Sequence, residues 1–239
     1  MNYLVVIPAR LQSTRLKEKL LIKINGIEMI ARTYLKCVEV VKNNNIIIAT
    51  DSKKIANVCK KYNANYILTS KKCLTGTDRV AEVAKKIKRD VYINVQGDEP
   101  FLNPIDLKKI INNSFKYKNL ILNGYADINE QDEYLNNSIP KLVFDNNKYL
   151  LYMSRAAIPG NKKNNFKKGF KQICIYSFPR KKLLDFNKII KKSFLEKLED
   201  IEILRFLEKS EKIKMIKLSG KSFAIDTPID LNKAKNYNI

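Results

Sequence analysis

The sequence contains no histidine among its 239 residues. This absence excludes every mechanism in which imidazole serves as general base, as partner of a nucleophile or as metal ligand. The four cysteines are widely scattered and form no C-x-x-C pair, so we expect reduced thiols, as in a cytosol, and no structural zinc site. Any metal would have to be a hard cation on carboxylates. The cysteines are Cys37, Cys59, Cys73 and Cys174.

Long apolar runs are absent as well. The segment YLVVIPA before Arg10 is short, and no later stretch approaches the ~20 apolar residues of a membrane span. We therefore expect a cytoplasmic protein with no membrane partner. A chain of this length can bury most of the apolar surface of its unfolded state, so it needs no disulfide or metal for stability.

Acidic residues are few relative to basic ones: 24 Asp and Glu stand against 46 Lys and Arg, a net charge of +22. Such an excess raises nucleic-acid binding as a hypothesis. However, the excess is mostly lysine, spread over the whole chain and mixed with abundant Asn and Ile. There is no basic stripe with stacking aromatics and no recognisable nucleic-acid motif. We therefore expect no nucleic-acid partner.

The first hundred residues alternate between two kinds of segment. Apolar runs of strand length alternate with helical patterns, which indicates a Rossmann-like, mostly parallel sheet with helices on both faces. In such a sheet, ligands bind outside the carboxyl ends of the strands. The expected strands are at 3–9, 45–50, 65–70 and 90–100, and the helices at 27–43, 52–63 and 77–88.

After residue 100 the alternation loosens, and no internal repeat is found. A hairpin is expected to turn at Asn146 and Asn147, followed by a polar and basic loop at 160–171. We expect one domain over 1–239, with residues about 135–180 forming a smaller region. The remaining expected elements are helices at 103–117, 180–190 and 195–209, and strands at 172–178 and 213–218.

A cationic loop follows the first strand, in the segment VVIPARLQSTRLKEK. It lies at the carboxyl edge of the sheet, where its N–H groups and long cationic side chains would surround a triphosphate. The glycines of a P-loop or a dinucleotide-binding turn are missing. Taken alone, the stretch is equally compatible with a solvated basic turn.

Carboxylates follow other strands. NVQGDEP ends a strand at the same edge, where Gly97 allows a close backbone approach and Asp98 can hold magnesium. Asp226, in AIDTPIDL, is either part of a helix start or a second carboxylate returned to the metal. Each motif is weak alone, but together with the cationic loop they fit a nucleotide triphosphate site.

Seven motifs in this order resemble the 3-deoxy-manno-octulosonate cytidylyltransferase family, and the resemblance covers essentially the whole chain. The motif S-T-R-L-x-x-K separates this family from the sialic-acid synthetases, whose first loop is glycine-rich. The motifs are A-R-x-x-S-T-R-L-x-x-K at 9–19, TGTDRVAEV at 75–83, NVQGDEP at 94–100, LYMSRAAIP at 151–159, IYSF at 175–178, LExLExxExLRxLE at 195–208 and IDTPIDL at 225–231.

The resemblance implies a nucleotidyltransferase of the nucleotide-diphospho-sugar transferase fold. It would transfer CMP from CTP to an ulosonic sugar acid with Mg²⁺ as cofactor, for lipopolysaccharide or capsule. It implies that Arg10, Ser13, Arg15 and Lys19 hold the triphosphate and that Asp98 and Asp226 bind the metal. Family members are typically homodimers, here joined through the hairpin at 141–155 and the strand at 172–178. The other implied site residues are Thr75, Gly76, Thr77 and Arg79 by the nucleoside, Gln96 by the sugar, and Arg155, Gln172, Tyr176, Glu199 and Glu202 in or near the sugar-acid pocket.

The sequence departs from the family pattern where the family meets its sugar. Gln172 and Cys174 replace a His and a Gly, Ile203 replaces a Gln, and Ala224 replaces a Gly. An uncharged amide and a lost polar partner alter the recognition of hydroxyl groups. We therefore expect 3-deoxy-manno-octulosonate (KDO) to be a usable but not the best acceptor, with an 8-amino-KDO or another ulosonic acid preferred.

Two other functions remain open from the sequence. One is a basic module that binds nucleotide or nucleic acid without turnover. The other is a nucleotidyltransferase with a different nucleotide or acceptor, such as the methylerythritol-phosphate cytidylyltransferases, although their opening loop is rich in glycine. Release of pyrophosphate from CTP in the presence of a sugar acid would separate these functions from the first.

Overall fold

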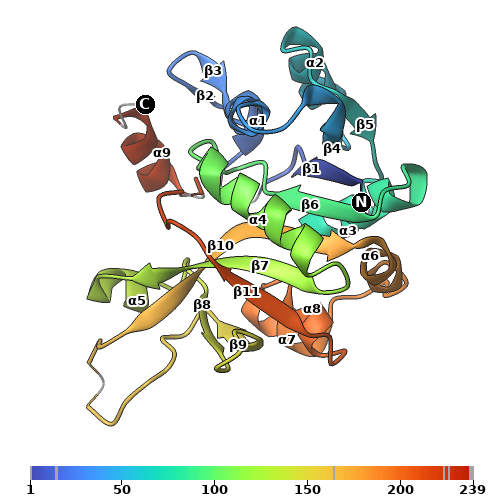
Figure 1. Cartoon of the computed structure of the whole chain (residues 1–239). Coiled ribbons are helices and arrows are strands. Elements are labelled where there is room, and N and C mark those ends of the chain that lie inside the picture. Colours follow the sequence, from blue (N-terminus) through green and yellow to red (C-terminus); the bar gives the residue numbers. More distant parts are fainter. Residues whose placement is uncertain (1, 14–15, 164, 223, 226, 237–239) are drawn as a thin grey trace.

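The central sheet organises the protein (Figure 1). The computed structural model describes the chain except residues 1, 14–15, 164, 223, 226 and 237–239. The strands follow the order β11-β7-β10-β6-β1-β4-β5, and in this path only β10 runs antiparallel to its neighbours. The mostly parallel sheet expected from the sequence is therefore confirmed. The strands are β1 (Tyr3–Ala9), β4 (Ile46–Thr50), β5 (Tyr66–Leu68), β6 (Val91–Val95), β7 (Ile121–Ile128), β10 (Gly169–Pro179) and β11 (Ile213–Lys217).

Helices cover both faces of the sheet, because successive side chains of a strand point to opposite faces. In β1, Val5 and Ile7 pack in one apolar cluster with α1, α2 and α4, whereas Leu4 and Val6 pack in another with α3, α6 and α8. The helices are α1 (Met29–Val38), α2 (Lys53–Lys61), α3 (Gly76–Lys86), α4 (Pro104–Lys116), α6 (Arg180–Phe186), α7 (Phe194–Glu199), α8 (Leu204–Leu207) and α9 (Pro228–Lys235).

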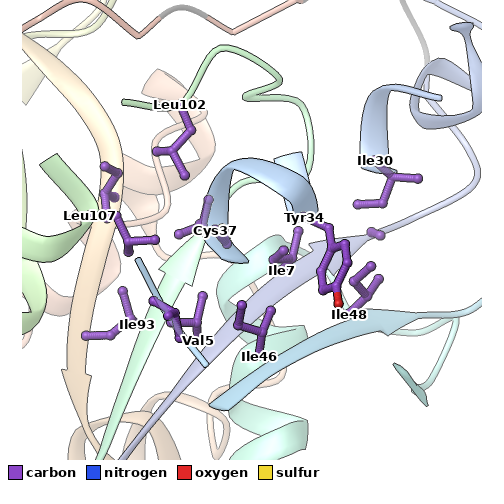
Figure 2. Packing of buried hydrophobic residues seen from close by; sticks show 14 of the residues in the cluster. Val5, Ile7, Ile30, Tyr34, Cys37, Ile46, Ile48, Ile93, Leu102 and Leu107 are labelled. Carbon is purple, nitrogen blue, oxygen red and sulfur yellow. The ribbon is translucent and has the colours of Figure 1, made fainter. Parts of the chain in front are cut away.

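In the first cluster, one face of α1 packs on one face of the sheet. Ile30, Tyr34 and Cys37 lie on one face of α1 and pack over side chains from β1 and β4, as Figure 2 shows. Fully burying a side chain of this size stabilises a fold by about 1.5–3 kcal/mol. The apolar face of α1 thus holds that helix on the sheet.

Beyond β7, the chain forms a smaller layer beside the sheet. The hairpin of β8 (Lys141–Phe144) and β9 (Leu150–Ser154) pairs with β10 through β8. The strand expected at 172–178 is the central part of β10, between β6 and β7 and mostly buried. Little of that strand is therefore exposed, and the expected contact of two subunits through the hairpin and this strand stays a prediction. The helix α5 (Gln131–Leu135) precedes the hairpin.

Two local features differ from the expected elements. The helix expected at 195–209 is divided into α7 and α8, because Asp200 adopts a left-handed conformation with φ of 50°. A small hairpin of β2 (Lys23–Ile24) and β3 (Ile27–Glu28) turns at Asn25 and Gly26, both with positive φ. Short 3₁₀ turns are at Lys19–Leu21 (η1) and Asn43–Asn45 (η2).

The carboxyl ends of β1, β4 and β6 lie side by side, because β4 and β6 each pair with β1 in parallel. The C-terminal part of the chain returns to this edge, where the Ile225 N–H donates to the Asp98 carbonyl at 3.1 Å. No helix in the described part of the chain has the length and apolarity needed to cross a membrane.

Candidate active site

A cavity of about 220 Å³ opens at this carboxyl edge. It brings together residues from the loop after β1, the start of α3, the end of β6 and the segments around α7. Cations and carboxylates both face it. The lining residues are Pro8, Arg10, Gln12, Ser13, Lys19, Leu20, Cys73, Leu74, Thr75, Gly76, Arg79, Gln96, Gly97, Asp98, Lys192, Asp200 and Glu202.

Asp51, directly after β4, ties the cationic loop to α3. One carboxylate oxygen accepts from the Leu11 N–H at 3.2 Å, and the other accepts from Arg79 Nη2 at 2.9 Å. Arg79 is buried and also donates to Thr69 Oγ1 and to the Ser70 carbonyl. Arg79 therefore reaches the cavity edge with its guanidinium already engaged by protein partners.

The N-terminus of α3 faces the cavity. Its first N–H groups lack helical partners, and Glu202 supplies oxygens for two of them. Gly76 N and Thr77 N donate to the Glu202 carboxylate at 3.0 and 2.8 Å. Burial raises the pKa of Glu202 above its ordinary value, against the lowering effect of these hydrogen bonds. A Cβ at Gly76 would lie 3.1 Å from Oε1 of Gln96, so glycine lets the helix approach the end of β6.

A buried arginine joins the two walls of the cavity. Arg205 is fully buried; its Nη1 donates to Asp78 Oδ1 at 2.8 Å and its Nε to Glu196 Oε2 at 2.6 Å. Asp78 belongs to the first turn of α3, where Thr75 Oγ1 donates to it at 2.7 Å. The start of α3 and the start of α7 are thus held by one guanidinium with a carboxylate on either side.

Lys19 and Asp98 form the charged floor of the cavity. Lys19 Nζ lies 2.5 Å from Asp98 Oδ2, with side chains 10% and 26% exposed. Gly97 is required beside them, because a Cβ there would be 2.9 Å from the Pro8 carbonyl oxygen. The strand end therefore presents a carboxylate within direct reach of the cationic loop.

The donors around Asp98 suit a hard cation. Asp98 offers a partly exposed carboxylate, and the backbone next to Asp226 is held against it by the hydrogen bond from Ile225. Magnesium prefers one or two carboxylates together with substrate phosphates over a cage of protein ligands. No cluster of three or more Asp, Glu or Cys side chains suited to a metal occurs among the described residues. Asp226 itself lies outside the described residues, as does Arg15.

Arg155 and Glu199, expected in the sugar-acid pocket, do not line the cavity. Glu199 accepts from Ser154 Oγ at 2.7 Å and from the Arg155 N–H at 2.8 Å. Burial opposes the charge of Glu199, but these hydrogen bonds hold its pKa below the ordinary value. The pair connects β9 to the end of α7. The Arg155 guanidinium donates to the carbonyls of Asn137, Ser138, Glu199 and Asp200.

Gln172 and Tyr176 are buried residues of β10 and do not line the cavity either. The Gln172 amide N–H group donates to Asn123 Oδ1 at 3.0 Å and to the Tyr176 hydroxyl at 3.1 Å. Burial raises the pKa of Tyr176 well above its ordinary value. Ile203, the third altered position, is in the apolar core. The altered side chains Gln172 and Ile203 therefore do not line this cavity.

Nine of the expected residues thus line one cavity: Arg10, Ser13, Lys19, Thr75, Gly76, Arg79, Gln96, Asp98 and Glu202. Thr77 is buried behind it and contributes its N–H to Glu202. The sequence analysis missed Asp51, Lys192 and Asp200. Asp51 had a signal, since it directly follows a predicted strand at the same edge, whereas nothing in the sequence pointed to Lys192 or Asp200.

Comparison with known proteins shows to which family the chain is similar. A family model described as "Cytidylyltransferase" matches residues 4–213. A 3-deoxy-manno-octulosonate cytidylyltransferase of Chloroherpeton thalassium is 38% identical over 241 residues, covering 98% of this chain and 97% of the relative. One from Trichlorobacter lovleyi is 34% identical over 247 residues, covering 98% of both. A solved structure of CMP:2-keto-3-deoxy-manno-octonic acid synthetase complexed with CTP has a TM-score of 0.91 at 29% identity, covering 99% of this chain and 98% of that chain.

The fold and these matches define an enzyme of the cytidylyltransferase class, an α/β nucleotidyltransferase. Within this class, the chain belongs to the 3-deoxy-manno-octulosonate cytidylyltransferase family. It matches relatives from this family over nearly their full length. The resemblance seen in the sequence motifs is confirmed.

Proposed function

We propose that the protein transfers CMP from CTP to KDO and releases pyrophosphate, supplying activated sugar for lipopolysaccharide or capsule. The observation that carries this proposal is a cavity at the carboxyl edge of the sheet that is lined by Arg10, Lys19 and Asp98 together. Cations and a carboxylate in that place suit a triphosphate and its metal. The family membership supports the choice of cytidine as the base and of an ulosonic acid as acceptor.

The cationic loop would hold the triphosphate. Arg10 and Lys19 would neutralise charge on the leaving pyrophosphate, and Ser13 would donate a hydrogen bond to it. Arg15, which lies outside the described residues, would add a further cation. Stabilising charge where it develops is the main source of rate enhancement in phosphoryl transfer. No imidazole is required for this chemistry, which suits a chain without histidine.

The start of α3 would bind the nucleoside. Thr75 and Gly76 line the cavity, Thr77 fixes the helix end on Glu202, and Arg79 holds the cationic loop through Asp51. Gln96, against Gly76, would lie beside the sugar. These groups would orient the sugar hydroxyl and the α-phosphate, and orientation lowers the barrier of such a transfer.

Asp98 and Asp226 would hold the magnesium ion. The ion, when bound, would withdraw charge from the phosphate oxygens and increase the acidity of the attacking hydroxyl. Lys19, paired with Asp98, would keep that carboxylate aimed into the cavity. The hydrogen bond from the Ile225 N–H to the Asp98 carbonyl supports this pair of aspartates, because it brings the residue before Asp226 next to Asp98.

KDO itself is the proposed acceptor, rather than an altered sugar acid. The preference for a different acceptor was based on Gln172 and Ile203, but neither lines the cavity, and Gln172 already uses its amide on Asn123 and Tyr176. The named relatives are KDO enzymes as well. Gln172 and Ile203 therefore give no support for a sugar changed at its distal end.

We also propose a cytoplasmic homodimer that contacts through the hairpin of the smaller region at about 135–180. Leu151 of β9 is 59% exposed, and a large apolar side chain left so open on a hairpin suits a contact with a second copy. Sedimentation of the wild type and of Leu151→Asp tests this. A monomeric wild type would contradict it.

The function is tested by incubating the purified protein with CTP, KDO and magnesium and measuring pyrophosphate and CMP-KDO. We expect turnover with CTP, none in excess chelator, and far slower turnover with ATP, GTP or UTP. A parallel assay compares kcat/KM for KDO and 8-amino-KDO, for which we expect KDO to be preferred. CTP binding without pyrophosphate release would contradict the proposal and favour a binding module.

A further inference from the structure

Asp51 contacts the cationic loop, residues 10–19, but does not line the cavity. It directly follows β4, and its neighbours Thr50 and Ser52 are both buried. The Ser52 hydroxyl caps α2 by accepting from two N–H groups of the first turn. The carboxylate of Asp51 therefore projects from a backbone that the strand and the helix fix on either side.

Both oxygens of this carboxylate are used on groups that shape the cavity wall. Oδ1 accepts from the Leu11 N–H, and Leu11 stands between Arg10 and Gln12, which line the cavity. Oδ2 accepts from Arg79, whose side chain is 3% exposed, whereas that of Asp51 is 14% exposed. Hydrogen bonds to a charged group are strong where water is largely excluded. Asp51 thus fixes the start of the loop to α3.

The other end of the loop has a weaker attachment to the same part of the fold. Lys54 of α2 pairs with Glu18 at 2.6 Å, and these side chains are 62% and 35% exposed. An ion pair as exposed as this one contributes little, because water screens it. Asp51 is therefore the stronger of these two attachments.

Charge and position make opposite predictions for Asp51. A carboxylate near a triphosphate repels it, so charge alone predicts that Asp51 weakens the binding of CTP. Position predicts the reverse, because a loop that is already held in its binding conformation loses less freedom when the ligand binds. Asp51 touches Leu11 and Arg79 directly, whereas its repulsion of a phosphate in the cavity acts over a longer distance. Position should therefore outweigh charge.

We propose that Asp51 is a positioning residue that holds the cationic loop in place for the triphosphate through the Leu11 N–H and Arg79. This inference rests on the proposed function, in which that loop binds the triphosphate of CTP. The net effect of Asp51 on CTP affinity is favourable, although its charge has the same sign as that of the ligand.

The test is steady-state kinetics of two Asp51 variants. Asp51→Ala removes both hydrogen bonds and should raise the KM for CTP roughly tenfold or more, the usual effect of losing charge-assisted contacts. Asp51→Asn can still accept from the Leu11 N–H but cannot pair with Arg79, so it should raise this KM by a smaller factor. If Asp51→Ala does not fold, the sign of the change in Asp51→Asn decides. The KM for KDO should change by less than about twofold, because distant sites act independently.

Calorimetry gives a reading that does not depend on turnover. CTP is titrated with magnesium and without acceptor into the wild type and each variant, and the dissociation constants should follow the order of the KM values. In a double-mutant cycle, Asp51→Asn should have less effect on CTP affinity once Arg79 is glutamine, because part of its action passes through that arginine.

The matched control is Asp106→Asn. Asp106 is also a buried carboxylate with two contacts to a distant segment, since it accepts from the Ser219 N–H at 2.9 Å and from the Ser219 hydroxyl at 2.6 Å. It does not line the cavity. The variant should lower stability in urea and leave the affinity for CTP unchanged, which separates positioning from a general loss of stability.

The outcomes separate this inference from the function it depends on. CTP affinity that rises or stays unchanged in Asp51→Asn would overturn the positioning role, and so would a change confined to the KM for KDO. A wild type that binds CTP but forms no CMP-KDO contradicts the proposed function, while calorimetry still decides the role of Asp51. A wild type that does not bind CTP contradicts both.

Discussion

Asp98 is the carboxylate on which the chemistry of the site depends most directly. Asp98→Asn should lower kcat by about 100-fold or more, because the amide keeps the shape but loses the charge that would hold a metal at the transferring phosphate. The fold should be unaffected, since the side chain is only partly buried. Steady-state kinetics and circular dichroism of the variant provide the measurements.

The control for this variant is Asp127→Asn. Asp127 also pairs with a lysine, Lys217, at 2.6 Å, but on β7 and outside the cavity. It should retain wild-type turnover. An Asp98→Asn enzyme that keeps more than half of the wild-type kcat would remove Asp98 from the proposed metal site.

Single residues were predicted well where the signal was local. Lys19 and Asp98 each follow a predicted strand, and parallel strands bring such residues to one edge. The roles of Arg155, Gln172 and Glu199 in a sugar-acid pocket stay predictions, and their hydrogen-bond partners could not be predicted because these partners lie elsewhere in the chain. Arg155 reaches carbonyls 17 and 45 residues away, and sequence spacing does not reveal which long-range partner captures a side chain.

At the scale of elements, Arg205 joins α3 to the α7–α8 segment. Arg205→Met should reduce the free energy of unfolding by about 3–5 kcal/mol, because it leaves the buried carboxylates of Asp78 and Glu196 without their cation. Arg205→Lys should lose less, since the charge remains. Urea unfolding measures both.

An exposed pair serves as the reference for that experiment. Lys188→Ala, which removes an exposed ion pair, should cost only about 0–1 kcal/mol. Equal losses for Arg205→Met and Lys188→Ala would mean that the buried arginine does not link these elements.

The hairpin is anchored by Lys141, which is fully buried and donates to the carbonyls of Asn136 and Arg155. Burial, aided by the charge of Arg155, lowers the pKa of Lys141 from 10.5 to about 8. Between these two values the unfolded chain binds the proton and the folded chain does not. This residue therefore makes stability rise with pH from about 8 to 10.5.

The variant that isolates this effect is Lys141→Met, which lacks the titrating group. The difference in unfolding free energy, wild type minus variant, should increase by up to about 3 kcal/mol between pH 7.5 and 10.5. Urea melts of both proteins across that range provide the comparison. A difference that stays constant or falls would contradict the lowered pKa.

Helices and strands were predicted where the periodic pattern of apolar residues continued over enough residues. The strand expected at 3–9 and the helix at 103–117 appear as β1 and α4 with nearly the expected bounds. The helix at 195–209 was wrong in one respect, because the apolar period continues through Asp200 although the backbone does not. Asn25-Gly26, a typical hairpin dipeptide, was an available signal for β2 and β3 that was missed.

At the scale of the whole molecule, the net charge of +22 should act mainly through solvated lysines. Binding to a random DNA duplex should be measurable at low salt and vanish at moderate salt, since non-specific contacts depend steeply on ionic strength. Fluorescence anisotropy across a salt series measures this. Binding that resists salt and prefers one sequence would revive a nucleic-acid partner.

The return of the chain at Ile225 has a consequence for how the enzyme is made. Ile225 contacts the carbonyl of Asp98, which precedes it by 127 residues in the chain. Synthesis proceeds from the N-terminus at about 5–20 residues/s, so β1, β4, β5 and β6 exist as nascent chain well before that contact can form. A ribosome stalled near residue 200 would carry β1, β4, β5 and β6, but neither β11 nor the segment that completes the site. The site can therefore be completed only after the segment that contains Ile225 has been synthesised.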